Sequence, residues 1–278
     1  MIIKDNQTIL IPIDFSKNSY FSVKQTYNLA RHTKSKLMLL HVSDKGGAER
    51  SDELVKLANA TREETGLEVG TKIMTGELYA TINKVAADID ASLTVIALEV
   101  NAKFKSGIFS NAMTIPKFLV ASPCPVITMR SSDLRDGCQN IVMPFDLTAE
   151  SREKVSYAVQ LALLYKSDIR VVSIFKPNDE EYENKLFPYL QQVKKFIKAE
   201  GVNCFNRSLP SNTPAEAIIE YAIKHECDLI IQINQRDLTF SEKMHGTVGH
   251  KVVELSPIPV LNVNPMKRES MSHYSSGM

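Results

Sequence analysis

Two aspartates stand in the same local pattern, at a place where a carboxylate could have a chemical role. Asp14 follows the apolar run Ile-Leu-Ile-Pro-Ile at residues 9–13, and Asp146 follows Ile-Val-Met-Pro-Phe at residues 141–145. A Ser or Thr lies two positions after each carboxylate. Such a carboxylate could contact a ligand, or it could cap the following helix or close a turn. The spacing alone leaves both interpretations open.

Other motifs that carry catalysis or bind metals are missing from the sequence. It contains no G-x-S-x-G, P-loop, G-x-G-x-x-G or H-E-x-x-H pattern. The four cysteines are scattered without a C-x-x-C pair, which fits neither a zinc site nor a disulfide framework. His245 and His250 are five positions apart, with no carboxylate or cysteine partner at ligand spacing. We therefore expect no catalytic residue and no metal site.

The chain repeats itself in several further blocks. Leu-Ala followed by Lys-Ser occurs at residues 29–35 and 161–167, and Ser-Pro-x-Pro-Val occurs at residues 122–126 and 256–260. The blocks keep the same order in both halves, with an offset of 132 to 134 residues. This regularity predicts a duplicated pair of similar domains.

We place the first domain at residues 1–132, a linker at 133–138, the second domain at 139–266 and a polar tail at 267–278. The linker is too short to let two domains move independently. We therefore expect the halves to pack against each other as an internal pseudo-dimer.

Each half alternates short apolar runs with segments of helical spacing, which is typical of βαβ units and a parallel sheet. Right-handed crossovers then lead to an open, mostly parallel, five-stranded sheet with helices on both faces. Asp14 and Asp146 would lie where such sheets bind ligands, at the carboxyl ends of the strands. A capping box is expected at residues 213–216, Thr-Pro-Ala-Glu. The strands are expected at residues 8–13, 37–42, 69–74, 93–98, 125–129, 140–145, 169–175, 202–208, 228–233 and 259–263.

The composition excludes several classes of partner. Among 278 residues, 33 Lys and Arg face 32 Asp and Glu, so there is no bulk attraction to nucleic acid or to an anionic membrane. No apolar run approaches the roughly 20 residues that a membrane-spanning helix needs. The first residues also lack the features of a signal peptide. We expect a cytoplasmic protein with no nucleic-acid or membrane partner.

Taken together, the motifs resemble the universal stress protein family in its tandem two-domain form, over about residues 8–130 and 139–264. The resemblance rests on the Pro-x-Asp-x-Ser/Thr pattern, the Leu-Ala and Lys-Ser blocks, the helix start Asn-Thr-Pro-Ala-Glu-Ala-Ile at 212–218, and Ser-Pro-x-Pro-Val. It implies a flavodoxin-like α/β fold whose last strand commonly serves dimerisation. It also implies that some members hold ATP.

In those members the Asp after the first strand and a residue ending the second strand contact the adenosine. A loop G-x2-G-x9-G-(S/T) after the fourth strand wraps the phosphates, because glycines let backbone N–H groups approach them closely. The nucleotide-binding residues that the resemblance implies here are Pro144, Asp146, Ile174, Gly246 and Thr247 in the second half, and Asp14 and Val42 in the first. Arg236 is a further candidate, which would act through its side chain.

The phosphate loop is where this sequence departs from the family pattern. Gly246 and Thr247 match its terminal pair, but Ile233 and Arg236 stand at the first two glycine positions. The corresponding first-half region, residues 98–114, has a single glycine. The phosphate cradle is therefore expected to be absent in the first half and incomplete in the second. Side chains could compensate, although a solvated loop is the simpler interpretation; the candidates are Arg236, Lys243, His245 and Thr247.

The leading interpretation is a non-enzymatic stress-response or regulatory protein that acts through ligand or partner binding and has a degenerate nucleotide site. The partner would be an unknown regulatory protein, and a homodimer stays open. The alternative is a member that binds ATP in the second domain, with slow hydrolysis or self-phosphorylation. The first interpretation needs no cofactor, whereas the alternative needs ATP or another adenine nucleotide.

Overall fold

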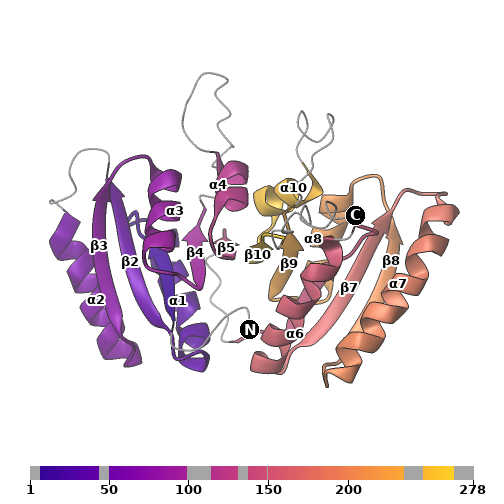
Figure 1. Cartoon of the computed structure of the whole chain (residues 1–278), viewed down its shortest axis with the longest axis horizontal. Coiled ribbons are helices and arrows are strands. Elements are labelled where there is room, and N and C mark those ends of the chain that lie inside the picture. The colour runs from indigo at the N-terminus through magenta and orange to yellow at the C-terminus, as the bar shows by residue number, and fades with distance from the viewer. Residues whose placement is uncertain are drawn as a thin grey trace, which may run out of the picture.

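The computed structural model of the chain describes residues 7–43, 50–98, 114–130, 137–148, 150–234 and 247–265. Two α/β halves lie side by side, with strands in the middle of each half and helices outside (Figure 1). This confirms the predicted fold class. The predicted domain limits stay predictions, since most of the linker and the whole tail lie outside the described residues.

The predicted strands are all present, within two residues of the expected bounds. The inner strands of each half are apolar on both faces, as expected of strands covered by helices on both sides, whereas the outermost strand of each half is more polar. The first half contains β1 (Thr8–Pro12), β2 (Lys36–Ser43), β3 (Val69–Thr75), β4 (Leu93–Ala97) and β5 (Val126–Met129). The second half contains β6 (Asn140–Pro144), β7 (Asp168–Phe175), β8 (Cys204–Pro210), β9 (Leu229–Ile233) and β10 (Val260–Val263).

Helices cover both faces of the sheet and enclose two apolar layers. The first-half helices are α1 (Lys17–His32), α2 (Ser51–Thr65), α3 (Leu78–Asp88) and α4 (Ile115–Ala121). The second-half helices are α5 (Glu150–Glu153), α6 (Val155–Tyr165), α7 (Glu180–Ala199), α8 (Pro214–Lys224) and α10 (Val248–Leu255). Side chains from α1, α2, α6 and α7 form one core cluster. Those from α3, α4, α8 and α10 form the other.

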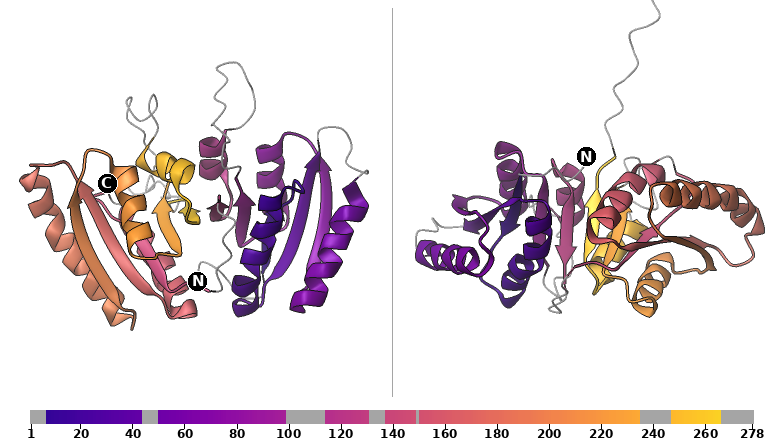
Figure 2. Two further views of the ribbon diagram at one scale, coloured as in Figure 1. Left: turned by 180° about the vertical axis from the view of Figure 1, so that it is seen from behind. Right: turned by 90° about the horizontal axis from the view of Figure 1, so that it is seen from below.

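The two halves share one continuous sheet of ten strands, in the order β3-β2-β1-β4-β5-β10-β9-β6-β7-β8. Strands within each half are parallel, whereas β5 and β10 pair antiparallel at the centre. Figure 2 shows these two central strands side by side between the halves. The expected internal pseudo-dimer is thus built by main-chain hydrogen bonding between the last strands of the two repeats.

Polar side chains reinforce this central junction. Asn262, only 2% exposed, uses its amide nitrogen to donate to the carbonyl oxygens of Val126 at 3.2 Å and Val260 at 3.0 Å. Arg130 donates from Nε to the carbonyl oxygen of Val253 at 2.9 Å, across the same boundary. Buried donors with satisfied acceptors fix the register of the junction, because a slipped pairing would leave them unpaired.

The predicted capping box at residues 213–216 is wrong. Thr213 does precede α8, but its side chain accepts no hydrogen bond from the helix. Its hydroxyl instead lies 3.3 Å from the hydroxyl of Ser211, which also accepts the Thr213 N–H at 3.0 Å. A capping box is present at α10, where Thr247 and His250 bond reciprocally.

In the described part of the chain, no helix is both long enough and apolar enough to cross a lipid bilayer.

The junction yields a first prediction. Asn262→Asp keeps the side-chain shape but removes the donors to the two carbonyl oxygens and buries a carboxylate beside them. We expect the free energy of unfolding to fall by about 3 kcal/mol, measured by urea denaturation. Asn59→Asp makes the same chemical change on the exposed face of α2 and should alter stability by no more than about 0.5 kcal/mol. Equal effects of the two variants would contradict a stabilising role for Asn262.

Candidate functional site

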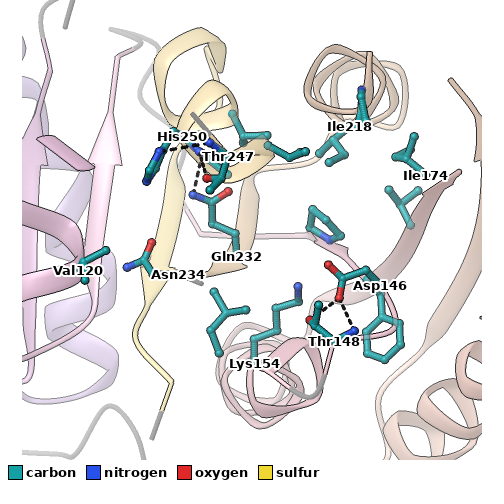
Figure 3. Close-up of a pocket in the computed structure, with 18 of the residues that line it drawn as sticks. Val120, Asp146, Thr148, Lys154, Ile174, Ile218, Gln232, Asn234, Thr247 and His250 are labelled. Carbon is teal, nitrogen blue, oxygen red and sulfur yellow. Dashed lines mark hydrogen bonds between the residues drawn. The ribbon is translucent and has the colours of Figure 1, made fainter. Parts of the chain in front are cut away.

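A cavity of about 260 Å³ opens at the carboxyl ends of β6, β7 and β9 in the second half (Figure 3). Strand β6 lies between β9 and β7 in the sheet, so this is the point where the strand order reverses. Open α/β sheets bind ligands at that point, because the loops on either side diverge and leave a crevice. One side chain of the first half, Val120 of α4, also contributes to the wall.

Four of the predicted site residues meet in this cavity: Pro144, Asp146, Ile174 and Thr247. They come from the ends of β6 and β7 and from the start of α10. Arg236 and Gly246 fall outside the described residues, as do Lys243 and His245. The structure therefore brings together the predicted residues that it describes from the second half, while their contact with a ligand stays a prediction.

The two first-half counterparts do not reach this cavity. Asp14 is exposed, and Val42 packs against the apolar cluster beneath α3 and α4. Both lie at the corresponding strand ends of the other half. The candidate site is therefore a property of the second half, with one wall completed by the first.

The structure shows that both aspartates close turns, one of the interpretations that the sequence left open. Asp146 accepts at Oδ1 from the N–H of Thr148 at 3.0 Å and from the hydroxyl of the same residue. Asp14 accepts at Oδ1 from the N–H of Ser16 at 2.9 Å. Partial burial raises the pKa of Asp14, but hydrogen bonds led by those from Ser16 outweigh it and hold the pKa below its usual value. Both carboxylates close turns.

Asp146 nevertheless keeps one oxygen for other partners. Within the described residues every hydrogen bond to its carboxylate uses Oδ1, and the side chain lines the cavity. Turn closure and ligand contact are thus compatible, since one carboxylate oxygen suffices for the turn.

Lys154 is a residue of the site that the sequence interpretation missed, as it missed Gln232 and Asn234. It immediately precedes α6, is only 4% exposed and extends into the middle of the cavity toward Asp146 (Figure 3). Burial lowers the pKa of its ammonium to about 8, although the charge of Asp146 acts in the opposite direction. No hydrogen bond or ion pair joins this ammonium to a described residue. A signal existed in the sequence, because Lys154 shares one face with buried Ala158 and Leu161, four and seven positions later.

Two amide side chains form the opposite wall, Gln232 on β9 and Asn234 directly after it. Gln232 donates from Nε2 to the carbonyl oxygen of Gly249 at 3.1 Å and to Oδ1 of Asn262 at 2.6 Å. Asn234 donates from Nδ2 to Oδ1 of Asn264 at 2.8 Å. The wall is therefore hydrogen-bonded to α10 and to the central junction, and its position is set by both.

Thr247 serves the helix that borders the cavity. Its hydroxyl accepts the N–H of His250 at 3.1 Å, and its own N–H donates to Nδ1 of that histidine at 3.4 Å. This reciprocal pair caps the first turn of α10 at the cavity rim. Helix N-termini favour negatively charged groups. Together with the ammonium and the amides, the arrangement suits a small polar ligand that carries negative charge.

The buried lysine leads to a pH prediction. Because burial holds the pKa of Lys154 below its unfolded value of 10.5, its charge costs folding free energy near neutral pH, and that cost declines as the pH rises above about 8. We expect Lys154→Met to be more stable than the wild type at about pH 7, and the difference to shrink by roughly 1–2 kcal/mol at about pH 9.5.

Urea denaturation of both proteins at the two pH values measures this difference. Tyr182 and His250 also line the cavity, and they are the same in both proteins. Lys195→Met, on the exposed face of α7, controls for the loss of one positive charge. A stability difference that does not change with pH would contradict the depressed pKa.

Comparisons with known proteins cover both halves of the chain. The model of the universal stress protein family matches residues 5–130 and 137–264. Universal stress protein MJ0531 of Methanocaldococcus jannaschii is 25% identical over an alignment of 156 residues; the match covers 50% of this chain and 91% of that protein.

Solved structures resemble the whole chain. A universal stress protein from Archaeoglobus fulgidus superposes with a TM-score of 0.76 at 16% identity, over 97% of this chain and 100% of that chain. A functionally unknown protein from Pseudomonas aeruginosa, PA1789, superposes with a TM-score of 0.68 at 22% identity, over 94% and 93% of the two chains. These likenesses show a shared fold. Since the family model matches each half in turn and the fold agrees along the whole length, the chain belongs to the universal stress protein family, in tandem form.

Proposed function

We propose that this protein is a non-enzymatic regulatory member of its family that responds to a small ligand bound in the second half. The observation that carries this proposal is the convergence of Asp146, Ile174 and Thr247 on one cavity at the switch point of the sheet. These are positions that the family resemblance implies for nucleotide contact. A cytoplasmic location and an unknown regulatory protein partner belong to the same proposal.

The ligand that suits the cavity best is an adenine nucleotide with few phosphates. Pockets for drug-sized ligands commonly measure about 300–1,000 Å³, so a cavity of about 260 Å³ favours a small occupant. Ile174 and Ile218 supply apolar surface for a base, and the second oxygen of Asp146 can accept a hydrogen bond from a ribose hydroxyl.

A degenerate phosphate site is the second part of the proposal. Ile233 lines the cavity at the position where the family pattern has its first loop glycine. A branched side chain there prevents the backbone from approaching a phosphate chain as closely as glycine allows. We therefore propose that a triphosphate gains little over a monophosphate.

The alternative is an ATP-binding member with slow hydrolysis or self-phosphorylation. It is favoured by Thr247, which matches the Ser/Thr of the phosphate loop and lies at the N-terminus of α10 on the cavity rim. Affinity for ATP relative to AMP distinguishes the two functions, because only an intact phosphate cradle makes favourable contacts with the two additional phosphates of ATP.

The proposed function predicts that Asp146→Ala weakens AMP binding by about tenfold, because the variant loses a hydrogen-bond acceptor inside the cavity. Calorimetric titration of nucleotide-free protein measures the dissociation constant. Asp14→Ala is the matched control, since Asp14 closes the same turn in the first half away from the cavity. Unchanged binding by Asp146→Ala, or equal losses in both variants, would contradict the assignment.

The degenerate site predicts that ATP and AMP bind the wild type with dissociation constants within about threefold of each other, because additional phosphates find no closely approaching backbone. The same titrations measure this ratio, with phosphate release followed in parallel. A preference for ATP well above tenfold, accompanied by release of phosphate, would favour the alternative.

A further inference from the structure

The two halves share a sheet register, so each position in the second-half cavity has a counterpart in the first half. Strand β1 places Ile9 opposite Leu93 of β4, and β6 places Ile141 opposite Leu229 of β9. Counting three residues beyond Leu93 and Leu229 pairs Ile96 with Gln232. In the same way, Leu98 and Asn234 correspond, because each lies five residues beyond its starting residue. The backbone agrees, because the N–H of Leu98 donates to β5 as the N–H of Asn234 donates to β10.

The helix side of the cavity is compared in the same way. Lys154 lies eight residues after Asp146, and the residue eight positions after Asp14 is Ser22. Ser22 is fully buried, and its hydroxyl donates to the carbonyl oxygen of Ser19 at 2.8 Å, within its own helix. The neutral serine is thus satisfied locally where the second half has an ammonium.

These comparisons show that the fold does not need a charged or amide side chain at these three positions. In the first half the three positions are Ser22, Ile96 and Leu98, all of them buried. In the second half they are a lysine and two amides, and all three line the cavity. At these three positions, the ammonium and the two amides are therefore found in the second half and not in the first.

A buried ammonium without a partner is costly, because desolvation is not repaid by a hydrogen bond or an opposite charge. Lys154 is in that position within the described residues: it is 4% exposed, it extends into the cavity, and its ammonium has no hydrogen bond or ion pair. Asp146 contributes attraction from across the cavity. An anionic ligand group beside the ammonium would supply the missing partner.

We infer that the ammonium of Lys154 binds the phosphate of the ligand, and that this side chain replaces the glycine loop as the main phosphate contact. The inference rests on the proposed function and deepens it, since it concerns the same cavity. Lysine suits this task as a compact charge with three donors. The hydroxyl of Thr247 and the first turn of α10 lie on the same cavity and add favourable potential for a phosphate.

The test measures the acylation rate of Lys154 by acetic anhydride at about pH 8, read by peptide mass spectrometry on the full-length protein; a phosphate bound to the ammonium should slow this reaction. Four probes are compared at equal ionic strength: sodium chloride, inorganic phosphate, adenosine and AMP. We expect AMP to slow the labelling at least about fivefold relative to chloride, and inorganic phosphate and adenosine each to slow it less than AMP does. Labelling of the exposed Lys195 should not change.

The outcomes separate this inference from the proposed function. Protection by phosphate, with AMP no better than phosphate alone, supports the Lys154 site and contradicts the adenine nucleotide as ligand. Equal protection by adenosine and AMP, with none from phosphate, supports the nucleotide cavity and overturns the role of Lys154. Protection by no probe overturns both.

A variant provides the second arm. Lys154→Met keeps most of the length of the side chain and removes its charge. We expect the variant to bind adenosine like the wild type and to lose the preference for AMP over adenosine, which we expect to be about tenfold in the wild type. Lys195→Met should retain that preference. A preference for AMP that survives in Lys154→Met would overturn the inference, because the bound adenosine shows that the cavity is intact.

Discussion

Three residue pairs between β5 and β10 turn two similar halves into one molecule: Thr128 with Val260, Ile127 with Leu261, and Val126 with Asn262. Ile127 and Leu261 occupy the same position in the two repeats, so a local twofold axis passes between them. Each strand would otherwise be the unpaired edge of a five-stranded sheet. Their pairing orients α4 and α10 toward each other and brings Val120 of the first half to the ligand cavity of the second. The site therefore depends on the junction as well as on its own loops.

The junction and the cavity also share hydrogen bonds. Gln232 connects the cavity wall to Asn262, and Asn262 donates to Val126 of the first half. Asn234 connects the wall to Asn264, which donates to the carbonyl oxygens of Leu119 at 3.1 Å and Ser122 at 3.0 Å. Each relay consists of buried or half-buried groups whose donors are already used. A ligand that displaced the amide of Gln232 or Asn234 would therefore break hydrogen bonds that help to hold the halves together.

Sequence reasoning could predict most of the fold because its signals are local and repeated. Apolar runs of strand length between helical stripes indicated every strand, and parallel topology placed Asp146 at the crevice. The family resemblance added Ile174 and Thr247. Lys154 escaped prediction because a single lysine near a helix start normally lies on a solvated face. It is buried next to α5, which ends one residue earlier and contacts β9, a strand distant in the chain. The capping box predicted at Thr213 was wrong for a local reason. The hydroxyl of Ser211, two residues earlier, forms hydrogen bonds with Thr213 in place of the predicted cap.

The continuous sheet has a consequence for aggregation. A strand with unpaired main-chain groups is a template for other chains, and apolar strands are the most hazardous. Val260, Leu261 and Val263 of β10 are all buried, so a second half on its own would present an apolar edge of this kind. The strands that do end the sheet, β3 and β8, carry charged and imino residues such as Lys72, Arg207 and Pro210. Fusion of two repeats in one chain thus places β5 and β10 in the interior of the sheet. The edges are then β3 and β8, whose charged residues and proline disfavour pairing with another chain.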